Sequence, residues 1–448
     1  MDERQTTRRL AIEAARQARE VDANLEEVRL TRRPDEIEAY RELARRADPV
    51  PPYDHSYELR GDFAYAGEYG SGKAFVWYGA GNTRITRPLV LVEGFDPLNE
   101  INYLSLYTAL NADGMVTAAR ASGFDIVILD FTRGADYVQR NAFVLVALLE
   151  DLRIEVGSGG AKTVLVGASM GGLIARYALA YMSKLGLKHN TSLFVSFDAP
   201  QRGACIPLGL QHFISYFSRY SGAGALRDQI ARTIDSVASL QMLTYHYRWG
   251  GGEDDKAQPH PLRSTLLQEL AAYDSYAPDV RKVAVANGSG HGKTLFGART
   301  LILDWERTGA YGWCFALPEY KADGWDELFK GWYCGDALWS KHITAAWPYD
   351  GCPGAKRDTT SFVADKLKEL AGGTIKTRVD EHCFIPTVSA LDADDTRNPG
   401  NPVISVKDAE TAGTFKTAFD AYVYCENNEN HIFISPEITA FLKKEIGI

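Results

Sequence analysis

The sequence predicts an α/β fold with a mostly parallel central sheet flanked by helices, and three observations carry this prediction. Short continuous apolar runs occur at 88–94 and 124–130, with a helix-length segment between them. A third run, from Thr163 to Val166, follows a helical pattern at 143–152. Strands buried on both faces are typically apolar and β-branched. Strands and helices alternating in this way, with right-handed crossovers, form a parallel sheet covered on both faces.

Further strands are predicted on both sides of this series. Alternating aromatic stretches at 57–65 and 74–78, separated by Gly-Ser-Gly, favour an antiparallel start to the sheet. A terminal helix is expected around Pro436 to Lys444. Three more strands are expected at 193–197, 281–286 and 421–424.

The stretches between the later strands are long enough to be insertions. Residues 204–279 place Leu, Ile, Phe, Tyr and Met at helical spacing, whereas 299–377 are rich in Trp and Tyr. Sparse apolar positions among Arg, Glu and Ala at 4–47 predict one or two amphipathic helices. The expected domains are an N-terminal helical arm at 1–50, an α/β core at 51–203, 280–298 and 378–448, a helical lid insertion at 204–279, and a Trp- and Cys-containing insertion at 299–377.

The composition of the 448-residue chain limits the classes of protein to which it can belong. It is 45% hydrophobic, a globular balance that favours a large folded core over disorder. A net charge of −9 disfavours a nucleic-acid surface. No apolar run approaches the roughly 18 residues that span a bilayer, so no transmembrane segment is expected. The charged N-terminus lacks a signal-type apolar core, which favours a cytoplasmic protein unless the chain is a mature secreted form.

The six cysteines are far apart and form no C-x-x-C pair or metal-ligand spacing. Buried reduced thiols and no metal site are therefore expected. Cys314, Cys334 and Cys352 fall in one Trp- and Gly-rich segment, which leaves open a disulfide there if the protein is secreted.

The most informative motif is Gly167-Ala-Ser169-Met-Gly171, a G-x-S-x-G sequence between a predicted strand and a predicted helix. Such a turn holds its serine at a strained corner where the hydroxyl stands clear of the backbone, and small residues two positions away avoid a clash. A plain βα turn, in which Gly and Ser only permit tight packing, is the alternative interpretation. The apolar run before the motif and the helical spacing after it favour a nucleophile elbow.

On this motif and its flanks, the chain resembles the α/β-hydrolase superfamily, in particular its lipase and esterase branch. The resemblance spans roughly residues 85–300 and 378–448. It implies a serine nucleophile, a carboxylate and a histidine in that chain order, together with an oxyanion hole and no cofactor. Ser169 is then the candidate nucleophile, because a hydroxyl attacks an ester only when a neighbouring imidazole accepts its proton.

The candidate base is His431. In the resembled fold the histidine follows the last strand, and His431 is the histidine between the run at 421–424 and the terminal helix. A capping or surface role in a polar loop is the alternative interpretation. The fallback candidates are His382 and His342, and the expected packing residues are His212 and His246.

The candidate acid is Asp198. Many members of the family carry the acid one strand later, but here that strand ends Ala286-Asn-Gly-Ser, without a carboxylate. Phe-Asp198-Ala-Pro is similar to the Leu-Asp-Pro-Ala segment of pancreatic-type lipases, although an Asp-x-Pro turn is the alternative interpretation. The remaining carboxylate candidates are Asp392, Asp380 and Asp420.

The resemblance assigns the oxyanion hole to the backbone N–H groups of Phe95 and Met170. Gly94 would let the backbone approach a substrate carbonyl. Glu93 stands where lipases commonly have histidine, so its charge has to be paired or solvated. The candidate partners are Arg133 and Arg176, with ordinary surface ions as the alternative.

A competing motif is Asn287-Gly-Ser-Gly-His-Gly-Lys293-Thr294, which nearly matches a phosphate-binding G-x-x-x-x-G-K-T loop. Leu-Ile-Leu-Asp304 even mimics a magnesium-holding strand end. A phosphate loop must open a long helix, whereas 295–303 is predicted as a strand. The sequence context therefore disfavours nucleotide binding.

Together these features predict a cofactor-free serine hydrolase of carboxylic esters that cleaves a small-molecule or lipid ester through an acyl-enzyme. Amidase, thioesterase or phospholipase chemistry uses the same triad, and a catalytically silent binding module is the non-enzyme alternative. Aromatic residues of the insertions would suit a hydrophobic acyl chain, although they equally suit the insertions' own cores. No nucleic-acid partner is expected, and a peripheral contact with a lipid interface stays open.

Overall fold

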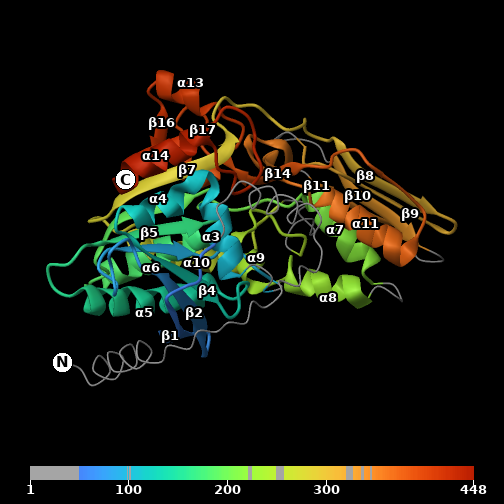
Figure 1. The fold of residues 1–448 in the computed structure, drawn as a ribbon. Coiled ribbons are helices and arrows are strands. Elements are labelled where there is room, and N and C mark those ends of the chain that lie inside the picture. The colour runs from blue at the N-terminus through green and yellow to red at the C-terminus, as the bar shows by residue number, and fades with distance from the viewer. Residues whose placement is uncertain are drawn as a thin grey trace. The chain divides into compact units, whose positions relative to one another are not determined.

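The chain forms two compact units, each made of separate stretches of sequence. Unit 1 contains the described residues up to Phe197 together with 269–283 and 434–448, and unit 2 contains 198–268 and 284–433 (Figure 1). The arm predicted for 1–50 lies outside the described residues, apart from Val50. The computed structural model describes residues 50–97, 99, 102–219, 224–248, 257–318, 326–333, 338–343 and 346–448.

The sheet of unit 1 is mostly parallel, as predicted. Strands β3, β4, β5 and β6 pair in parallel, whereas β1 pairs with β2, and β2 with β4, in the antiparallel direction. The middle strands are buried along nearly their whole length, which is why they read as continuous apolar runs. In spatial order the strands are β1 (His55–Tyr65), β2 (Glu68–Trp77), β4 (Asp125–Phe131), β3 (Pro88–Val92), β5 (Thr163–Ala168), β6 (Thr191–Phe197) and the start of β7 (Arg281–Ser289).

Helices cover both faces of this sheet. Helices α3 and α4 contact β4 and each other, and α5 packs on α6; the ribbon in Figure 1 shows the sheet between these two pairs. The last helix, α14, begins as its sequence predicts, with the Ser435 side chain accepting from the Ile438 N–H. The helices of unit 1 are α3 (Tyr103–Leu110), α4 (Met115–Ala121), α5 (Val138–Val156), α6 (Met170–Lys184) and α14 (Pro436–Ile446), with a 3₁₀ turn at Ala112–Gly114.

A buried polar cluster ties three elements of unit 1 together. The Glu269 carboxylate accepts hydrogen bonds from the Tyr65 hydroxyl, the Gln139 amide and the Tyr177 hydroxyl, at 2.9, 2.8 and 3.1 Å. Burial together with this carboxylate raises the pKa of both tyrosines well above the ordinary value. Glu269 lies on α10 (Pro261–Ala272), which begins in unit 2 and ends in unit 1.

The first part of unit 2 is helical, in the range where the sequence predicts helices. Helix α7 contacts β9 and β10 of a five-stranded antiparallel sheet. The Phe217 and Trp305 rings pack edge to face at 4.8 Å, and Trp305 is 1% exposed. Trp305 is therefore a core residue of the insertion, and the expectation of a lid above an active site stays a prediction. The helices in this range are α7 (Leu208–Phe217), α8 (Gly224–Arg232), α9 (Val237–Met242) and α10.

The segment at 299–377 is mainly β-structure. Five of its strands form one antiparallel sheet that carries stacked aromatic rings, including Tyr311 on Trp313 at 5.3 Å, whereas Trp325 lies outside the described residues. In spatial order the strands are β11 (Trp339–Ile343), β10 (Asp326–Tyr333), β9 (Ala310–Phe315), β8 (Leu301–Arg307) and β13 (Thr374–Thr377), and α11 spans Thr360–Ala371.

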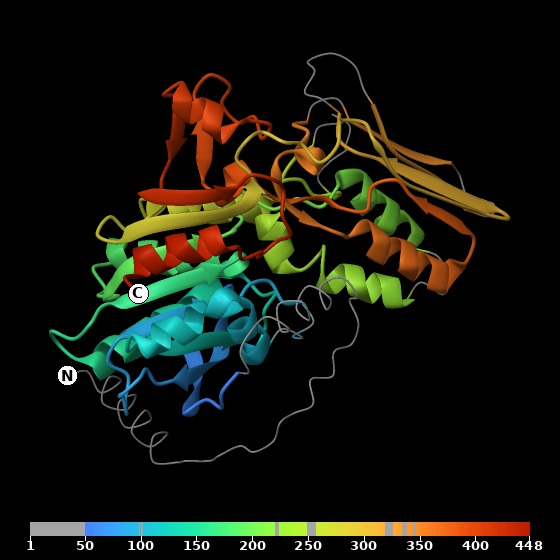
Figure 2. The same ribbon diagram turned by 45° about the horizontal axis from the view of Figure 1, so that its top comes forward.

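Unit 2 also contains short elements that the sequence analysis did not predict. Figure 2 shows the β15–β16 pair and α13 as an outlying part of the C-terminal region. Strand β17, which was predicted, lies beside β7. Strand β17 spans Ala421–Cys425. The unpredicted short elements are β12 (Gly354–Arg357), β14 (His382–Pro386), α12 (Thr387–Ala390), β15 (Ala393–Asp395), α13 (Val406–Thr411), β16 (Phe415–Thr417) and a 3₁₀ turn at Tyr349–Gly351.

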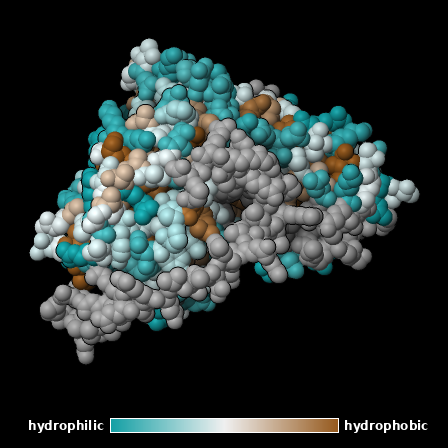
Figure 3. Space-filling model, viewed as in Figure 1, coloured by the Kyte–Doolittle hydropathy of each residue, from teal (hydrophilic) through white to brown (hydrophobic). Residues whose placement is uncertain are grey.

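The visible surface in Figure 3 is mainly hydrophilic or neutral where residues are described, with hydrophobic residues in small separate patches. No helix among the described residues has both the length and the apolar character that crossing a bilayer requires. The expected contact with a lipid interface stays a prediction.

The cysteines that the structure describes are thiols, not disulfides. Cys314 and Cys352 are buried and unbridged, and Cys334 lies outside the described residues. Within the described residues, the disulfide left open for this segment is therefore not formed. Instead, the Cys352 sulfur lies 3.5 Å from the sulfur of Cys383, and burial raises the pKa of the Cys383 thiol.

Candidate active site

Ser169 occupies a strained turn between β5 and α6 in unit 1. Its φ of 54° and ψ of −128° lie where non-glycine residues rarely occur. A Cβ at Gly167 would lie 2.4 Å from the Gly171 carbonyl oxygen, and one at Gly171 would lie 2.4 Å from the Val92 carbonyl oxygen. Both glycines are therefore required by sterics, as the G-x-S-x-G interpretation expects. The Ser169 side chain does not cap α6, although it precedes the helix.

The backbone after β3 approaches this turn. A Cβ at Gly94 would lie 3.1 Å from the Cβ of Ser169, so glycine permits the close approach. Met170 is the first residue of α6, and its N–H has no acceptor within the helix. Phe95, the other predicted donor, follows Gly94 and is half-buried. The oxyanion role of these two N–H groups stays a prediction.

Glu93 is fully buried beside the turn, and no arginine among the described residues pairs with it. Its Oε2 accepts from the Phe131 N–H at 2.6 Å. The expected partners are engaged elsewhere, since Arg133 pairs with Glu68 at 2.8 Å and Arg176 donates to the Ser275 carbonyl oxygen at 2.9 Å. The expectation that Arg133 or Arg176 neutralises Glu93 is therefore wrong.

The surroundings of the buried Glu93 carboxyl disfavour its ionised form. Burial, followed by the nearby Asp130 and Asp96, raises the pKa of Glu93 well above its ordinary value. Burial and Asp96 also raise the pKa of Asp130 to about 7. Both shifts have the same origin, since a buried charge is costly and neighbouring carboxylates repel each other.

Asp198 and His431 form a hydrogen-bonded pair in unit 2. The Asp198 side chain is fully buried, and its Oδ2 lies 2.7 Å from the His431 Nδ1. Its other oxygen accepts from the Asn287 N–H at 3.0 Å, and its own N–H donates to the Val285 carbonyl oxygen at 2.8 Å. With Nδ1 hydrogen-bonded to a carboxylate, Nε2 is the nitrogen through which this imidazole would accept a proton.

Asn287 holds the loop that carries His431. Its side-chain Nδ2 donates to the Phe433 carbonyl oxygen at 2.7 Å, and its Oδ1 accepts from the Phe433 N–H at 3.1 Å. Its backbone carbonyl oxygen accepts from the Glu429 N–H at 2.9 Å. In the sequence, Asn287 stands out as a mismatch in a phosphate loop and as the place near a strand end where a carboxylate is missing. The available signal was that place near the end of β7, where the sequence resemblance would put the acid.

Two further contacts orient the imidazole of His431. Its ring packs edge to face against Phe384, with the centroids 5.0 Å apart at 77°. Its backbone N–H donates to the Lys356 carbonyl oxygen at 3.2 Å. The side chain is 15% exposed, so the ring is held on several sides but is not sealed from solvent.

The other acid candidates have different surroundings. The Asp392 carboxylate pairs with Arg202 at 2.7 Å, whereas Asp380 and Asp420 are exposed. Asp198 is the candidate that the structure brings to His431.

The fallback histidines are held in structural contacts. His382 is fully buried between the Cys383 carbonyl oxygen and the Thr359 hydroxyl, both at 2.8 Å, and burial lowers its pKa to about 4. His246 lies 3.3 Å from Asp235 inside unit 2. His342, the other fallback candidate, lies on β11. His212, an expected packing residue, lies on α7.

The segment resembling a phosphate loop has no helix after it. Residues 295–300 form turns, and the strand begins only at Leu301, so the predicted strand at 295–303 is wrong in its first half. Lys293 donates to the Asn427 side-chain oxygen at 2.8 Å. Without a helix N-terminus, the segment lacks the feature that holds phosphate in such loops. Among the described residues, no group of three or more His, Cys, Asp or Glu side chains is placed to hold a metal ion.

Comparison with known proteins gives a weak likeness in structure and none in sequence. No family model matches the chain, and no curated protein matches it. Est1E from Butyrivibrio proteoclasticus aligns with 51% of this chain and 77% of its own, at 12% identity and a TM-score of 0.29. An esterase from Pyrobaculum calidifontis aligns with 55% of this chain and 79% of its own, at 11% identity and a TM-score of 0.30.

The carboxylesterase EstE1, cloned from a metagenomic library, aligns with 55% of this chain and 82% of its own, at 15% identity and a TM-score of 0.29. The three structures are esterases by name, but likenesses of this size carry no argument about this chain. What this chain itself shows is a mostly parallel α/β sheet with a strained serine turn in one unit and an aspartate–histidine pair in the other.

Proposed function

We propose that this chain is a serine hydrolase of carboxylic esters, with Ser169 as nucleophile, His431 as base and Asp198 as the residue that orients the base. The observation that carries the proposal is the hydrogen bond between the buried Asp198 carboxylate and His431 Nδ1. A carboxylate in this role fixes the tautomer of the imidazole and stabilises the imidazolium that forms during catalysis.

The register of unit 1 supports the choice of serine. Ala168 and Phe197 are partners in the parallel β5–β6 pair, and Ser169 and Asp198 are the residues that directly follow them in the chain. The Ser169 N–H also donates to the Phe197 carbonyl oxygen at 2.9 Å. Functional residues of open α/β sheets collect at the carboxyl ends of such strands.

The proposed reaction has two steps. The Ser169 oxygen bonds to the ester carbonyl carbon as His431 takes the hydroxyl proton, and the C–O bond to the alcohol then breaks as that proton passes to the departing alcohol. Water, deprotonated by the same imidazole, releases the acid and restores the serine. The N–H groups of Phe95 and Met170 would stabilise the oxyanion in both steps.

The test is labelling by a fluorophosphonate together with hydrolysis of p-nitrophenyl acetate. We expect the probe to modify Ser169, and Ser169→Ala to lose the label and at least roughly a thousandfold in kcat/KM. Ser192→Ala is the matched control, because Ser192 is an exposed serine on β6. Unchanged hydrolysis in Ser169→Ala, or a label on another residue, would refute the mechanism.

A further inference from the structure

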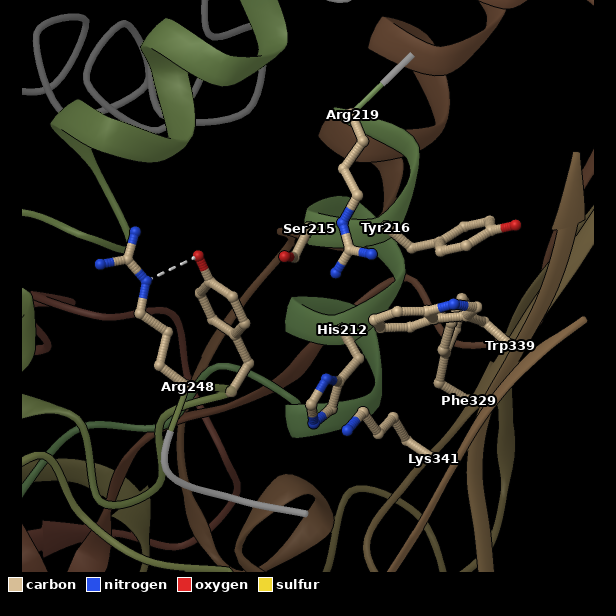
Figure 4. Close-up of a pocket in the computed structure, with 9 residues that line it drawn as sticks. His212, Ser215, Tyr216, Arg219, Arg248, Phe329, Trp339 and Lys341 are labelled. Atoms are coloured by element: carbon tan, nitrogen blue, oxygen red, sulfur yellow. Dashed lines mark hydrogen bonds between the residues drawn. The ribbon is translucent and has the colours of Figure 1, made fainter. Parts of the chain in front are cut away.

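A cavity of about 220 Å³ in unit 2 is separate from the residues proposed for catalysis. Nine residues line it, from α7, from position 219 just after α7, from the segment 247–248, and from β10 and β11. Figure 4 shows their side chains around one hollow. An apolar cavity of about 150 Å³ is large enough to hold benzene, and this cavity is somewhat larger. It therefore suits a ligand with one ring rather than a long chain.

The lining is cationic. It contains Arg219, Arg248 and Lys341, and none of its nine residues is an aspartate or a glutamate. Asp235 compensates Arg248 through an ion pair at 2.6 Å. For Arg219, no ion pair with a carboxylate occurs among the residues that the structure describes. Like charges gathered around one hollow repel each other, so an anion in it would be stabilised.

The positions of the cations suit a planar anion. The Arg219 guanidinium carbon lies 4.0 Å from the centre of the Trp339 ring, and the Lys341 ammonium lies 5.8 Å from the same ring. In Figure 4 the Arg219 guanidinium lies over the indole, and the Lys341 ammonium lies beside His212. Stacking on an indole restrains a guanidinium while its N–H edges remain able to donate to carboxylate oxygens.

Aromatic rings form the rest of the cavity. Phe329 is 1% exposed and Tyr216 is 2% exposed, so both form a buried floor. Trp339 is 38% exposed, which is unusual for a residue of this size, and it borders the hollow with Tyr247. An apolar ligand body would cover these faces, while its charged end would face the cations.

We propose that this cavity binds a small aromatic anion, of which a one-ring carboxylate is the simplest example. The cations recognise the carboxylate and the aromatic floor recognises the ring. The site does not depend on Ser169 or His431, and it would operate whether or not the chain hydrolyses esters.

The test is isothermal titration calorimetry of the full chain with sodium benzoate, benzyl alcohol and inorganic phosphate at low ionic strength. We expect benzoate to bind more tightly than either of the others, because only benzoate has both a charge and a ring. Its affinity should fall as salt is added, since the cations are partly exposed. Equal binding of benzyl alcohol would show that the cations do not matter, and equal binding of phosphate would show that the rings do not; either result overturns the proposal.

Two variants locate the binding. Arg219→Gln should weaken benzoate binding by about tenfold or more, because a charge-assisted contact is lost. Arg60→Gln is the matched control: Arg60 also lies 4.0 Å from a tyrosine ring centre, that of Tyr69, but on β1 of unit 1. Unchanged affinity in Arg219→Gln, or an equal loss in Arg60→Gln, would overturn the assignment.

Two further variants separate this site from folding defects and from the proposed catalytic residues. Lys341→Gln should reproduce the loss of affinity, and the thermal midpoints of both cavity variants should match that of the unmodified chain. Ser169→Ala should bind benzoate unchanged, because the proposed cavity does not include it. If benzoate binding disappears in Ser169→Ala and persists in Arg219→Gln and Lys341→Gln, the anion occupies the proposed catalytic site and the cavity proposal fails.

Discussion

The Asp198 side chain is fully buried, yet both of its carboxylate oxygens have hydrogen-bond partners, and so does the backbone N–H of this residue. Residue types and chain order were enough to name Asp198 as the first candidate, but they left Asp392 open as an alternative. The structure separates the two because Asp392 pairs with Arg202, whereas Asp198 pairs with His431. Sequence patterns report residue types, and the choice between two aspartates depends on which imidazole each one reaches.

Replacing Asp198 tests its proposed role directly. In Asp198→Asn, the amide would favour the wrong tautomer of His431, so we expect kcat for p-nitrophenyl acetate to fall by about ten-thousandfold. Asp392→Asn should stay within about twofold of the unmodified chain, because exposed ion pairs contribute little. Equal losses in the two variants, or a loss in Asp392→Asn alone, would contradict the assignment.

Glu93 and Asn287 show what residue-level reasoning missed. An arginine was one candidate partner for Glu93, but the charged groups near it are the carboxyl groups of Asp130 and Asp96, which raise its pKa together with burial. Asn287 was compared with the first glycine of a phosphate loop, but its side chain hydrogen-bonds both the carbonyl oxygen and the N–H of Phe433. Asp130 is distant from Glu93 in sequence and Phe433 is distant from Asn287, so no local pattern indicates either contact.

At the scale of elements, the β5–α6 turn was predictable because its requirements are local. The strand, the strained serine and the two glycines all lie within a few residues, and the glycines are needed because backbone atoms pass 2.4 Å from where their Cβ atoms would be. The short pairs β12–β14 and β15–β16 were not predictable. Strands of three to five residues show too few alternations to be recognised, and tertiary pairing stabilises them.

A glycine substitution tests the turn. Gly171→Ala places a methyl group against the Val92 carbonyl oxygen, so we expect the free energy of unfolding to fall by about 1–3 kcal/mol and ester hydrolysis to fall with it. Gly297→Ala is the control, since a Cβ there meets no atom within 4 Å. The measurement is denaturant unfolding of both variants, and a similar small change in the two would contradict the steric account.

At the scale of the whole molecule, each unit is assembled from separated stretches of chain. Unit 2 includes 284–433, a range that the sequence divides between core and insertion. Its interior contains Asp350, which is 2% exposed and accepts from the Leu317 N–H at 2.9 Å. Burial raises the pKa of Asp350 from an ordinary 3.8 to about 7.

This buried carboxyl predicts a pH dependence of stability. Because its pKa is higher in the folded state, the folded chain binds more protons than the unfolded chain between pH 4 and pH 7, and stability falls as pH rises through this window. Asp350→Asn keeps an acceptor for the Leu317 N–H and removes the titration. We therefore expect a flatter dependence of the thermal midpoint on pH from 4 to 7 in this variant.

The control for this prediction is Asp380→Asn, which alters an exposed carboxylate. Its pH profile should follow that of the unmodified chain. A slope in Asp350→Asn as steep as in the control would mean that Asp350 is ionised in the folded state throughout this range.

Local patterns in the chain were enough for the parallel sheet, its antiparallel start, the terminal helix and the turn at Ser169. These features depend on side chains spaced two or about 3.6 residues apart and on steric limits within a few residues. The tertiary structure alone decided which aspartate meets His431 across 233 positions of sequence, which groups surround Glu93, and that α7, β10 and β11 line one cationic cavity. Hydrogen bonds and burial between distant residues depend on the path of the chain, which no local spacing encodes.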